Sequence, residues 1–312
     1  MAKAKVYIDG QSGTTGLQIY ERIGARDDLE LMRIAEDKRH DIDERRRFIN
    51  DADIVFLCLP DDGAREAVSL VENPDTCIID ASTAHRTADG WTYGFPELNA
   101  GQRDAIAASK RIANPGCHAT GFISVTAPLV QAGIVPADYP LTCFSLTGYS
   151  GGGKKMIADY EDPDRSGVLD APGIYGLTLV HKHLPEMQKY CGLDHAPVFL
   201  PVVDDYYKGM ATTIMLQNRM LNGAPSAEDI SARLAEHYKD QHFVRVLPFG
   251  DHGPTLYANM LAGTNHLAIV VCGNDEQTTV TALFDNLGKG ASGAAVQNMN
   301  IVLGIDETTG LV

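Results

Sequence analysis

Short apolar runs alternate with amphipathic stretches over roughly the first third of the chain. The apolar runs predict strands at Lys5–Asp9, Leu29–Ile34, Ile54–Leu59, Cys77–Asp80 and Arg111–Ala113. The amphipathic stretches predict helices at Thr14–Ile23, Asp41–Asn50 and Ala64–Leu70. Strands and helices that alternate in this way are typical of a parallel sheet covered by helices. We therefore expect an α/β fold, with a Rossmann-type domain over residues 1–116.

The pattern changes at Cys117. An apolar helix is predicted over Gly121–Gln131, with Gly133 ending it. The strands predicted next are Leu141–Leu146, Pro197–Pro201, Ala211–Leu216, Phe243–Val246 and Ala268–Val271, with one helix at Ala227–Tyr238. This indicates a second, α+β domain over residues 117–284. Two further helices are predicted at Gln277–Leu287 and Ala294–Asn300, so that the C-terminal segment, residues 285–312, packs back on the first domain.

Composition and charge narrow the class of protein. The chain has 312 residues, of which 44% are hydrophobic and 21% charged, as in soluble proteins of two coupled domains. The formal net charge of -15 repels phosphate backbones and anionic lipids, so we expect neither a nucleic-acid nor a membrane partner. No apolar run is long enough to cross a bilayer, and the start of the chain lacks a signal-peptide pattern. We therefore expect a cytoplasmic protein.

A glycine-rich loop joins the first predicted strand to the first predicted helix. It runs Gly10-Gln11-Ser12-Gly13-Thr14-Thr15-Gly16, with the spacing G-x-x-G-x-x-G. Glycines let the backbone approach a pyrophosphate, whose charge is favoured at the helix N-terminus. The loop therefore predicts a dinucleotide site. Lys38 and Arg39 follow the second strand and favour NADP(H) over NAD, although Glu36 could instead bind a free ribose hydroxyl.

The chain's six cysteines are scattered without metal-ligand spacing, so no metal site is predicted. Several of them, Cys58, Cys77 and Cys272, lie in apolar runs and are expected to be buried and inert. Cys117 differs, because Asn114-Pro115-Gly116 predicts a sharp turn immediately before it and an apolar helix follows. A helix N-terminus favours the thiolate and offers N–H groups to an oxyanion. A thiolate beside a dinucleotide indicates attack on an activated acyl group, followed by hydride reduction of the thioester to an aldehyde.

Such chemistry also needs a proton donor and a pocket for an anion. His181 and His183 are the candidate acid/base residues; if their segment is extended, both imidazoles point to one side. The sequence leaves the choice between them open, and His118 is a third possibility. The residues that we expect to bind substrate or phosphate are Arg86, Asn114, Ser150, Gly151 and Lys154.

Four segments together carry a family resemblance. They are the Gly10–Gly16 loop, Asn114-Pro115-Gly116-Cys117, His181-Lys182-His183-Leu184-Pro185-Glu186, and the stretch Gly290-Ala291-Ser292-Gly293 through Asn300. In this respect the chain resembles the N-acetyl-γ-glutamyl-phosphate reductases of arginine biosynthesis, in their shorter subtype. The resemblance implies NADPH-dependent reduction of N-acetyl-L-glutamyl 5-phosphate to the 5-semialdehyde in a homodimer or homotetramer. It makes Cys117 the nucleophile and His183 or His181 the acid/base. One departure is His118, where the longer subtype usually has Tyr after the Cys.

Three alternatives stay open at this stage. Aspartate-semialdehyde dehydrogenase shares the chemistry, but it usually has Asn before its Cys, where this chain has Gly116. A reductase of carrier-linked aminoadipyl phosphate would need a basic docking surface, which the acidic chain does not favour. A non-catalytic NADP-binding regulator would have no use for Cys117 and the two histidines. We therefore expect an enzyme that acts on a small acyl phosphate.

Overall fold

The computed structural model describes residues 3–10 and 13–312, and the chain divides into two compact units. Unit 1 comprises Met1–Pro96, Ala100–Pro115 and Ala291–Leu311. Unit 2 comprises Glu97–Asn99 and Gly116–Gly290, with Val312. The C-terminal stretch therefore belongs to the same unit as the first strands.

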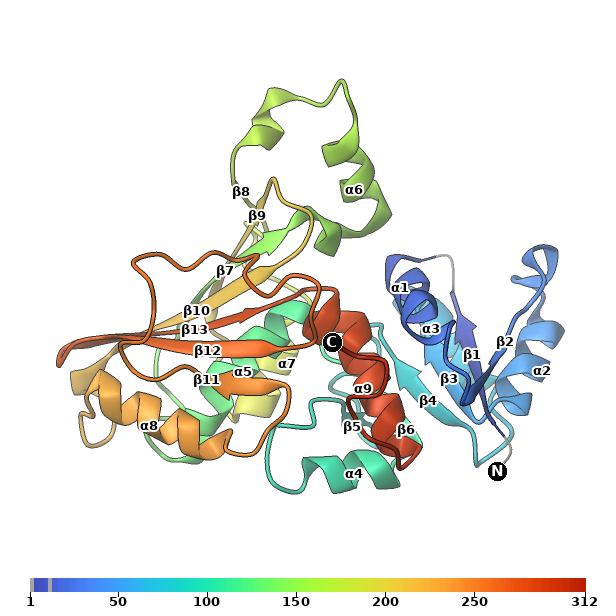
Figure 1. The fold of residues 1–312 in the computed structure, drawn as a ribbon, viewed down its shortest axis with the longest axis horizontal. Coiled ribbons are helices and arrows are strands. Elements are labelled where there is room, and N and C mark those ends of the chain that lie inside the picture. Colours follow the sequence, from blue (N-terminus) through green and yellow to red (C-terminus); the bar gives the residue numbers. More distant parts are fainter. Residues whose placement is uncertain (1–2, 11–12) are drawn as a thin grey trace. The chain divides into compact units, whose positions relative to one another are not determined.

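Unit 1 is built on a sheet of six parallel strands in the order β2-β1-β3-β4-β6-β5 (Figure 1). The strands are β1 (Ala4–Asp9), β2 (Leu29–Met32), β3 (Ile54–Leu57), β4 (Cys77–Asp80), β5 (Thr92–Tyr93) and β6 (Arg111–Ala113). The helices are α1 (Thr14–Ile23), α2 (Ile42–Asp51), α3 (Asp61–Ser69), α4 (Gln102–Ala108) and α9 (Gly293–Val302), and Glu36–Lys38 forms a short 3-10 helix. The predicted Rossmann-type sheet is confirmed.

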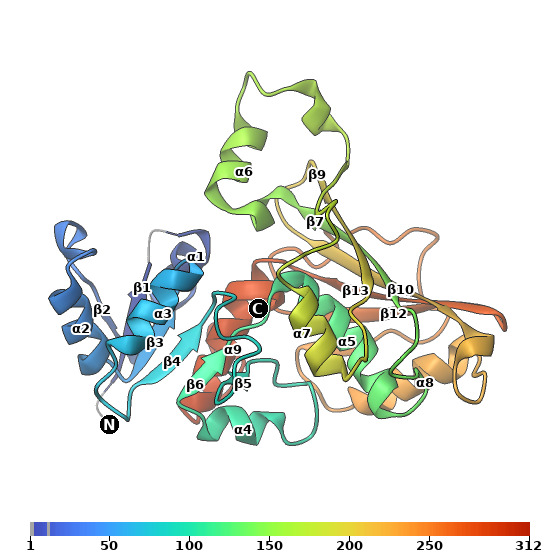
Figure 2. The same cartoon turned by 180° about the vertical axis from the view of Figure 1, so that it is seen from behind.

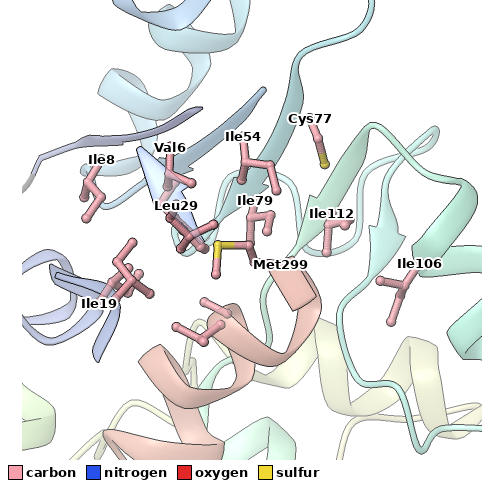
Figure 3. Packing of buried hydrophobic residues seen from close by; sticks show 14 residues of the cluster. Val6, Ile8, Ile19, Leu29, Ile54, Cys77, Ile79, Ile106, Ile112 and Met299 are labelled. Atoms are coloured by element: carbon pink, nitrogen blue, oxygen red, sulfur yellow. The ribbon is translucent and has the colours of Figure 1, made fainter. Parts of the chain in front are cut away.

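The strands of unit 1 are apolar throughout because both of their faces are buried. Successive side chains of a strand point to opposite faces, so Val6 and Tyr7 of β1 enter different cores. The core that contains Tyr7 is covered by α2 and α3. The core that contains Val6 includes Met299 of α9, which Figure 3 shows among the isoleucines of the sheet. The predicted return of the C-terminal helix is confirmed.

Unit 2 is built on a mixed sheet of seven strands in the order β11-β12-β13-β10-β7-β9-β8. The strands are β7 (Thr142–Gly148), β8 (Gly173–Ile174), β9 (Val198–Asp204), β10 (Met210–Gln217), β11 (Val244–Val246), β12 (Leu267–Gly273) and β13 (Gln277–Phe284). The helices are α5 (Cys117–Gln131), α6 (Gly153–Glu161), α7 (Leu184–Cys191) and α8 (Ala227–His237). Helix α5 packs on β10 and β13 and lies beside α7 (Figure 2). The predicted α+β character of this half is confirmed.

The helix predicted over Gln277–Leu287 is wrong, because Gln277–Phe284 is strand β13. This segment is rich in β-branched residues, which favour extended backbone. It is also hydrogen-bonded on both sides, since Thr281 lies opposite Thr213 of β10 and Val270 of β12. The sequence pattern also missed α4, α6 and α7. The other predicted elements are confirmed, with their ends displaced by a few residues.

Among the helices of the described residues, none has both the length and the apolar character that crossing a membrane requires.

Candidate active site

Cys117 is the first residue of α5, and Gly116 is its N-cap in extended conformation (φ -77°, ψ 147°). The helix is buried from His118 to Leu129, whereas Cys117 itself is partly exposed. The first turn of α5 contains no acidic residue. The positive end of a well-buried helix therefore acts on the Cys117 thiol without a competing charge in that turn, which favours the thiolate.

The turn before Cys117 is held by α7. The buried Glu186 accepts a hydrogen bond from the backbone N–H of Gly116, at 3.0 Å from nitrogen to Oε2. Gly290, the last residue of the Gly116–Gly290 segment, lies close to Cys117. A Cβ atom placed on Gly290 would lie 3.0 Å from the Cβ of Cys117. That contact is closer than most real Cβ contacts, so glycine at 290 leaves room for the nucleophile.

His118 lies at the centre of a chain of buried hydrogen bonds. Its Nδ1 lies 2.8 Å from Ser145 Oγ, which in turn lies 2.8 Å from Thr212 Oγ1. Its Nε2 lies 2.6 Å from the hydroxyl of Tyr175. Burial, with smaller contributions from His181 and Lys182, lowers the pKa of His118 from 6.5 to about 3. The imidazole is therefore neutral near pH 7.

His181 and His183 gather around the same imidazole. Their rings lie 4.7 Å apart edge to face, and each lies 5.7 Å from the ring of His118. The segment is not extended, because His183 has helical backbone angles and is the N-cap of α7. Its backbone N–H donates to Nδ1 of His181 over 3.2 Å, so a neutral His181 carries its proton on Nε2. The fold thus assembles both histidines beside the residue that follows Cys117.

Tyr175 is the residue of this site that sequence reasoning missed entirely. It lies just after β8, far from Cys117 in the sequence, and its hydroxyl reaches His118. Burial and, to a smaller extent, the charge of Cys117 raise the pKa of Tyr175, so its hydroxyl keeps its proton. Ser145 and Thr212 were missed as well, because a polar residue inside a strand gives no signal of its partner. Glu186 stood within the His-Lys-His segment without an assigned role.

The described glycines of the loop that follows β1 form a tight turn before α1. Gly10 follows β1 with a φ of +86°, where a Cβ atom would lie 2.4 Å from the carbonyl oxygen of Cys58. Gly13 is the N-cap of α1 and donates its N–H to Gly10 at 2.9 Å. Helix α1 begins at Thr14, includes Thr15 and Gly16, and has no acidic residue in its first turn. Ser12 lies outside the described residues.

The two cations after β2 lie on an exposed surface. The ammonium of Lys38 is 3.4 Å from Asp41, and Arg39 pairs with Glu36. Both side chains are about half exposed, at 51% and 43%. Their ion pairs are therefore weak enough for another anion to compete for them.

The expected anion-binding residues lie in different surroundings. In unit 1 the buried Arg86 donates to the carbonyl oxygens of Asn114 and Ala81, both at 3.0 Å. The Asn114 amide donates to the carbonyl oxygen of Ala291 at 3.0 Å.

In unit 2, the buried Ser150 accepts a 2.9 Å hydrogen bond from Asn286. Gly151 and Lys154 are exposed. The stretch is helical, because Tyr149–Gly152 is a 3-10 helix that runs into α6. Among residues 3–10 and 13–312, no three His, Cys, Asp or Glu side chains are grouped so that they could hold a metal.

Two family models match the chain. The model of the semialdehyde dehydrogenase NAD-binding domain matches residues 30–108, and that of the semialdehyde dehydrogenase dimerisation domain matches residues 117–286. The first match begins after the glycine-rich loop, so the interpretation of that loop depends on its own geometry. The second match begins at Cys117.

Solved structures with the same fold include an aspartate semialdehyde dehydrogenase II from Vibrio cholerae complexed with ASA. Its TM-score is 0.71 at 16% identity, over 97% of this chain and 99% of that one. An aspartate semialdehyde dehydrogenase from Candida albicans, solved with NADP, has a TM-score of 0.66 at 16% identity and covers 97% and 99% of the two chains. At this identity the likeness shows the fold alone.

Curated relatives are much more similar in sequence. An N-acetyl-gamma-glutamyl-phosphate reductase 2 from Nostoc is 49% identical over the whole of both chains. A protein of the same name from Pseudomonas putida is 49% identical over 96% of each. The chain therefore belongs to the N-acetyl-γ-glutamyl-phosphate reductase family, within the semialdehyde dehydrogenases.

Proposed function

We propose that the protein reduces N-acetyl-L-glutamyl 5-phosphate to N-acetyl-L-glutamate 5-semialdehyde with NADPH and releases phosphate, as a step of arginine biosynthesis. The observation that carries this proposal is Cys117 at the N-terminus of α5, with His181 and His183 gathered around the ring of His118, the next residue in the chain. Two relatives that are 49% identical over at least 96% of both chains bear the name of this activity.

Cys117 is the nucleophile of the proposed reaction. Its thiolate attacks the acyl carbon, the C–S bond forms, and the bond to the phosphate oxygen breaks. His183 or His181 gives a proton to the departing phosphate and is reprotonated from solvent. NADPH, when bound, supplies the hydride that reduces the thioester. The electron pair on oxygen then reforms the carbonyl and expels Cys117 as thiolate, so the enzyme returns to its first state.

The residues of unit 1 fit the cofactor. The left-handed backbone of Gly10 and the first turn of α1, which has no acidic residue, suit a pyrophosphate. Gly13, Thr14, Thr15 and Gly16 would hold it, together with Ser12, and Lys38 and Arg39 would take the 2′-phosphate of NADPH. Arg86, Asn114, Ser150, Gly151 and Lys154 are our candidates for binding substrate or phosphate.

We further propose that the enzyme works in the cytoplasm as a homodimer or homotetramer. The match of residues 117–286 to a dimerisation domain supports the oligomer. Sedimentation of the purified protein would give the oligomer size, and a monomer at micromolar concentration would contradict it.

The deciding experiment runs the reaction backwards. Purified protein is given NADP, phosphate and N-acetylglutamate semialdehyde, and NADPH is followed by its absorbance. We expect NADPH formation that needs phosphate and disappears in Cys117→Ser. Activity with aspartate semialdehyde and not with N-acetylglutamate semialdehyde would change the substrate assignment and leave the proposed reaction type in place. No activity with either aldehyde would contradict the proposed function and favour the carrier-linked substrate or the regulator.

A further inference from the structure

We propose that Tyr175 is a catalytic hydrogen-bond donor to the oxygen of the acyl group on Cys117, and that His118 is the positioning residue that aims this donation. The proposal rests on the covalent chemistry at Cys117 proposed above; it adds Tyr175, which no sequence motif identified, and gives His118 a positioning role. It is carried by a continuous row of four side chains, described here as the relay: Thr212, Ser145, His118 and Tyr175.

The relay runs from the sheet of unit 2 through His118, the residue after the nucleophile, to the hydroxyl of Tyr175. Thr212 lies on β10 and Ser145 on β7, and their hydroxyl oxygens are 2.8 Å apart. His118 lies on α5, directly after Cys117, and joins Ser145 at 2.8 Å to the Tyr175 hydroxyl at 2.6 Å. Thr212 and Ser145 are fully buried, and His118 is only 2% exposed. Water therefore has little access to these three positions, and the relay members satisfy one another.

A neutral imidazole gives the relay a direction. His118 carries one ring proton, because burial lowers its pKa to about 3. With that proton on Nε2, His118 donates to the oxygen of Tyr175, and its Nδ1 accepts from Ser145, whose oxygen accepts from Thr212. Tyr175 then has its own proton available for another acceptor. With the ring proton on Nδ1 instead, the hydrogen bonds run the other way: Tyr175 donates to Nε2 of His118, and the row of donors ends in the sheet.

The acceptor that we propose is the oxyanion formed when Cys117 is acylated. As the C–S bond forms, the π pair of the acyl C=O moves onto oxygen, which the first-turn N–H groups of α5 and the Tyr175 hydroxyl can stabilise. The proton stays on Tyr175, whose pKa is raised by burial and by the charge of Cys117. When the intermediate collapses, the pair returns to the carbonyl and the leaving group departs with its bonding electrons. No proton, oxidant or reductant is consumed by this step.

A purely structural role is the competing explanation, because His118 also packs edge to face on Phe199 at 5.1 Å. Two reagents separate the explanations. p-Nitrophenyl acetate acylates a thiolate through an oxyanion, whereas iodoacetamide alkylates it without one. Both act without NADPH or the natural substrate. Reaction at Cys117 is measured by mass spectrometry of its peptide, with Cys117→Ser as the blank.

Tyr175→Phe is expected to slow acylation about 10²-fold and to leave alkylation unchanged. Tyr238→Phe is the matched control, because it also removes a buried tyrosine hydroxyl that contacts α5. That hydroxyl donates to the carbonyl oxygen of Ser124 at 2.7 Å. Tyr238→Phe should leave both rates unchanged. Equal losses in both reactions of Tyr175→Phe, or no loss in either, would overturn the proposal.

Variants of His118 test whether it acts through Tyr175. His118→Leu should lose as much acylation as Tyr175→Phe, and the double variant should lose no more than either. His118→Gln, whose amide can still donate to Tyr175, should restore most of the rate. Losses that multiply in the double variant would contradict a shared route. Ser145→Ala is the milder probe if His118→Leu folds poorly; we expect a smaller loss of acylation with alkylation intact, and an unchanged acylation rate would contradict the relay.

The proposed function can fail separately from this inference. If the reductase assay fails while Cys117 is still acylated, the substrate assignment is wrong and the role of Tyr175 remains measurable. If the reductase assay succeeds but p-nitrophenyl acetate does not acylate Cys117 in the parent protein, the inference about Tyr175 is wrong and the proposed function stands. If both fail, both proposals are wrong.

Discussion

Two glycine N-caps in this molecule have nearly the same backbone and very different surroundings. Gly13 before α1 has φ -71° and ψ 161°, and Gly116 before α5 has φ -77° and ψ 147°. Both helices lack an acidic residue in their first turn, so both ends favour an anion. The described partners of Gly13 are backbone atoms, whereas Gly116 is bonded to Glu186 and is followed by Cys117 and the relay. A helix end attracts charge; side chains from distant segments determine what is done with it.

The largest effect should come from Cys117, the reactive side chain that follows the Gly116 N-cap. Cys117→Ser should lower turnover at least about 10³-fold, because a serine hydroxyl stays protonated at neutral pH and is a much weaker nucleophile. Binding of NADPH, measured by fluorescence titration, should be unchanged. Cys272→Ser, at another partly exposed cysteine, is the control and should keep full turnover. A Cys117→Ser variant with near-normal turnover would rule out the thioester.

A single added methyl group should distort the glycine loop that precedes α1. Gly10→Ala would place Cβ 2.4 Å from the Cys58 carbonyl in a left-handed conformation, so the loop must shift. We expect the affinity for NADPH to fall about 10–100-fold, as local strain of 1–3 kcal/mol implies. Alkylation of Cys117 by iodoacetamide should be unaffected.

Gly90→Ala separates backbone strain from the steric clash at Gly10. Gly90 has a similar φ of +79° and lies in the same unit, but nothing lies within 4 Å of its would-be Cβ. It should lose a little stability and no affinity for NADPH. If the two variants bind NADPH equally well, the Gly10 turn does not hold the cofactor.

The same comparison explains how far the sequence could lead. The sheet of unit 1 was predictable because strands buried on both faces are apolar throughout. The position of Cys117 at a helix start was predictable because Pro115 and Gly116 mark a turn before an apolar helix. Strand β13 was not, because its neighbours β10 and β12 decide its conformation, and they lie elsewhere in the sequence. Tyr175 was not for the same reason: only the folded chain brings it to His118.

The buried imidazole of His118 should also make the free energy of unfolding depend on pH. The pKa of His118 falls from 6.5 to about 3 on folding, so between these values the unfolded chain binds a proton that the folded chain does not. Stability should therefore fall as pH drops from 6.5 towards 3, by about 1 kcal/mol per pH unit from this residue.

Urea unfolding of the parent and of His118→Gln would isolate this contribution. Other groups, including His237, whose pKa is also lowered by burial, titrate in both proteins and cancel in the difference. The parent should lose stability more steeply than the variant over this pH range. Parallel curves would mean that His118 is protonated in the folded protein, which would also remove the neutral imidazole that the relay needs.

The smallest effect should come from Lys38 and Arg39, the two cations that follow β2. Lys38 and Arg39 are exposed and pair with Asp41 and Glu36, so replacing both by alanine should hardly change stability. If they bind the 2′-phosphate, the KM for NADPH should rise roughly fivefold to tenfold while the KM for NADH stays the same. Replacing Arg46 and Arg47 of α2 removes the same charge from the same unit, and it should affect neither cofactor. An equal rise in KM for NADPH and NADH would show that Lys38 and Arg39 act only through the overall electrostatic field of the protein. A rise for NADPH alone would mean that at Gly13, as at Gly116, the helix end attracts the anion, and side chains from other segments determine which anion is bound.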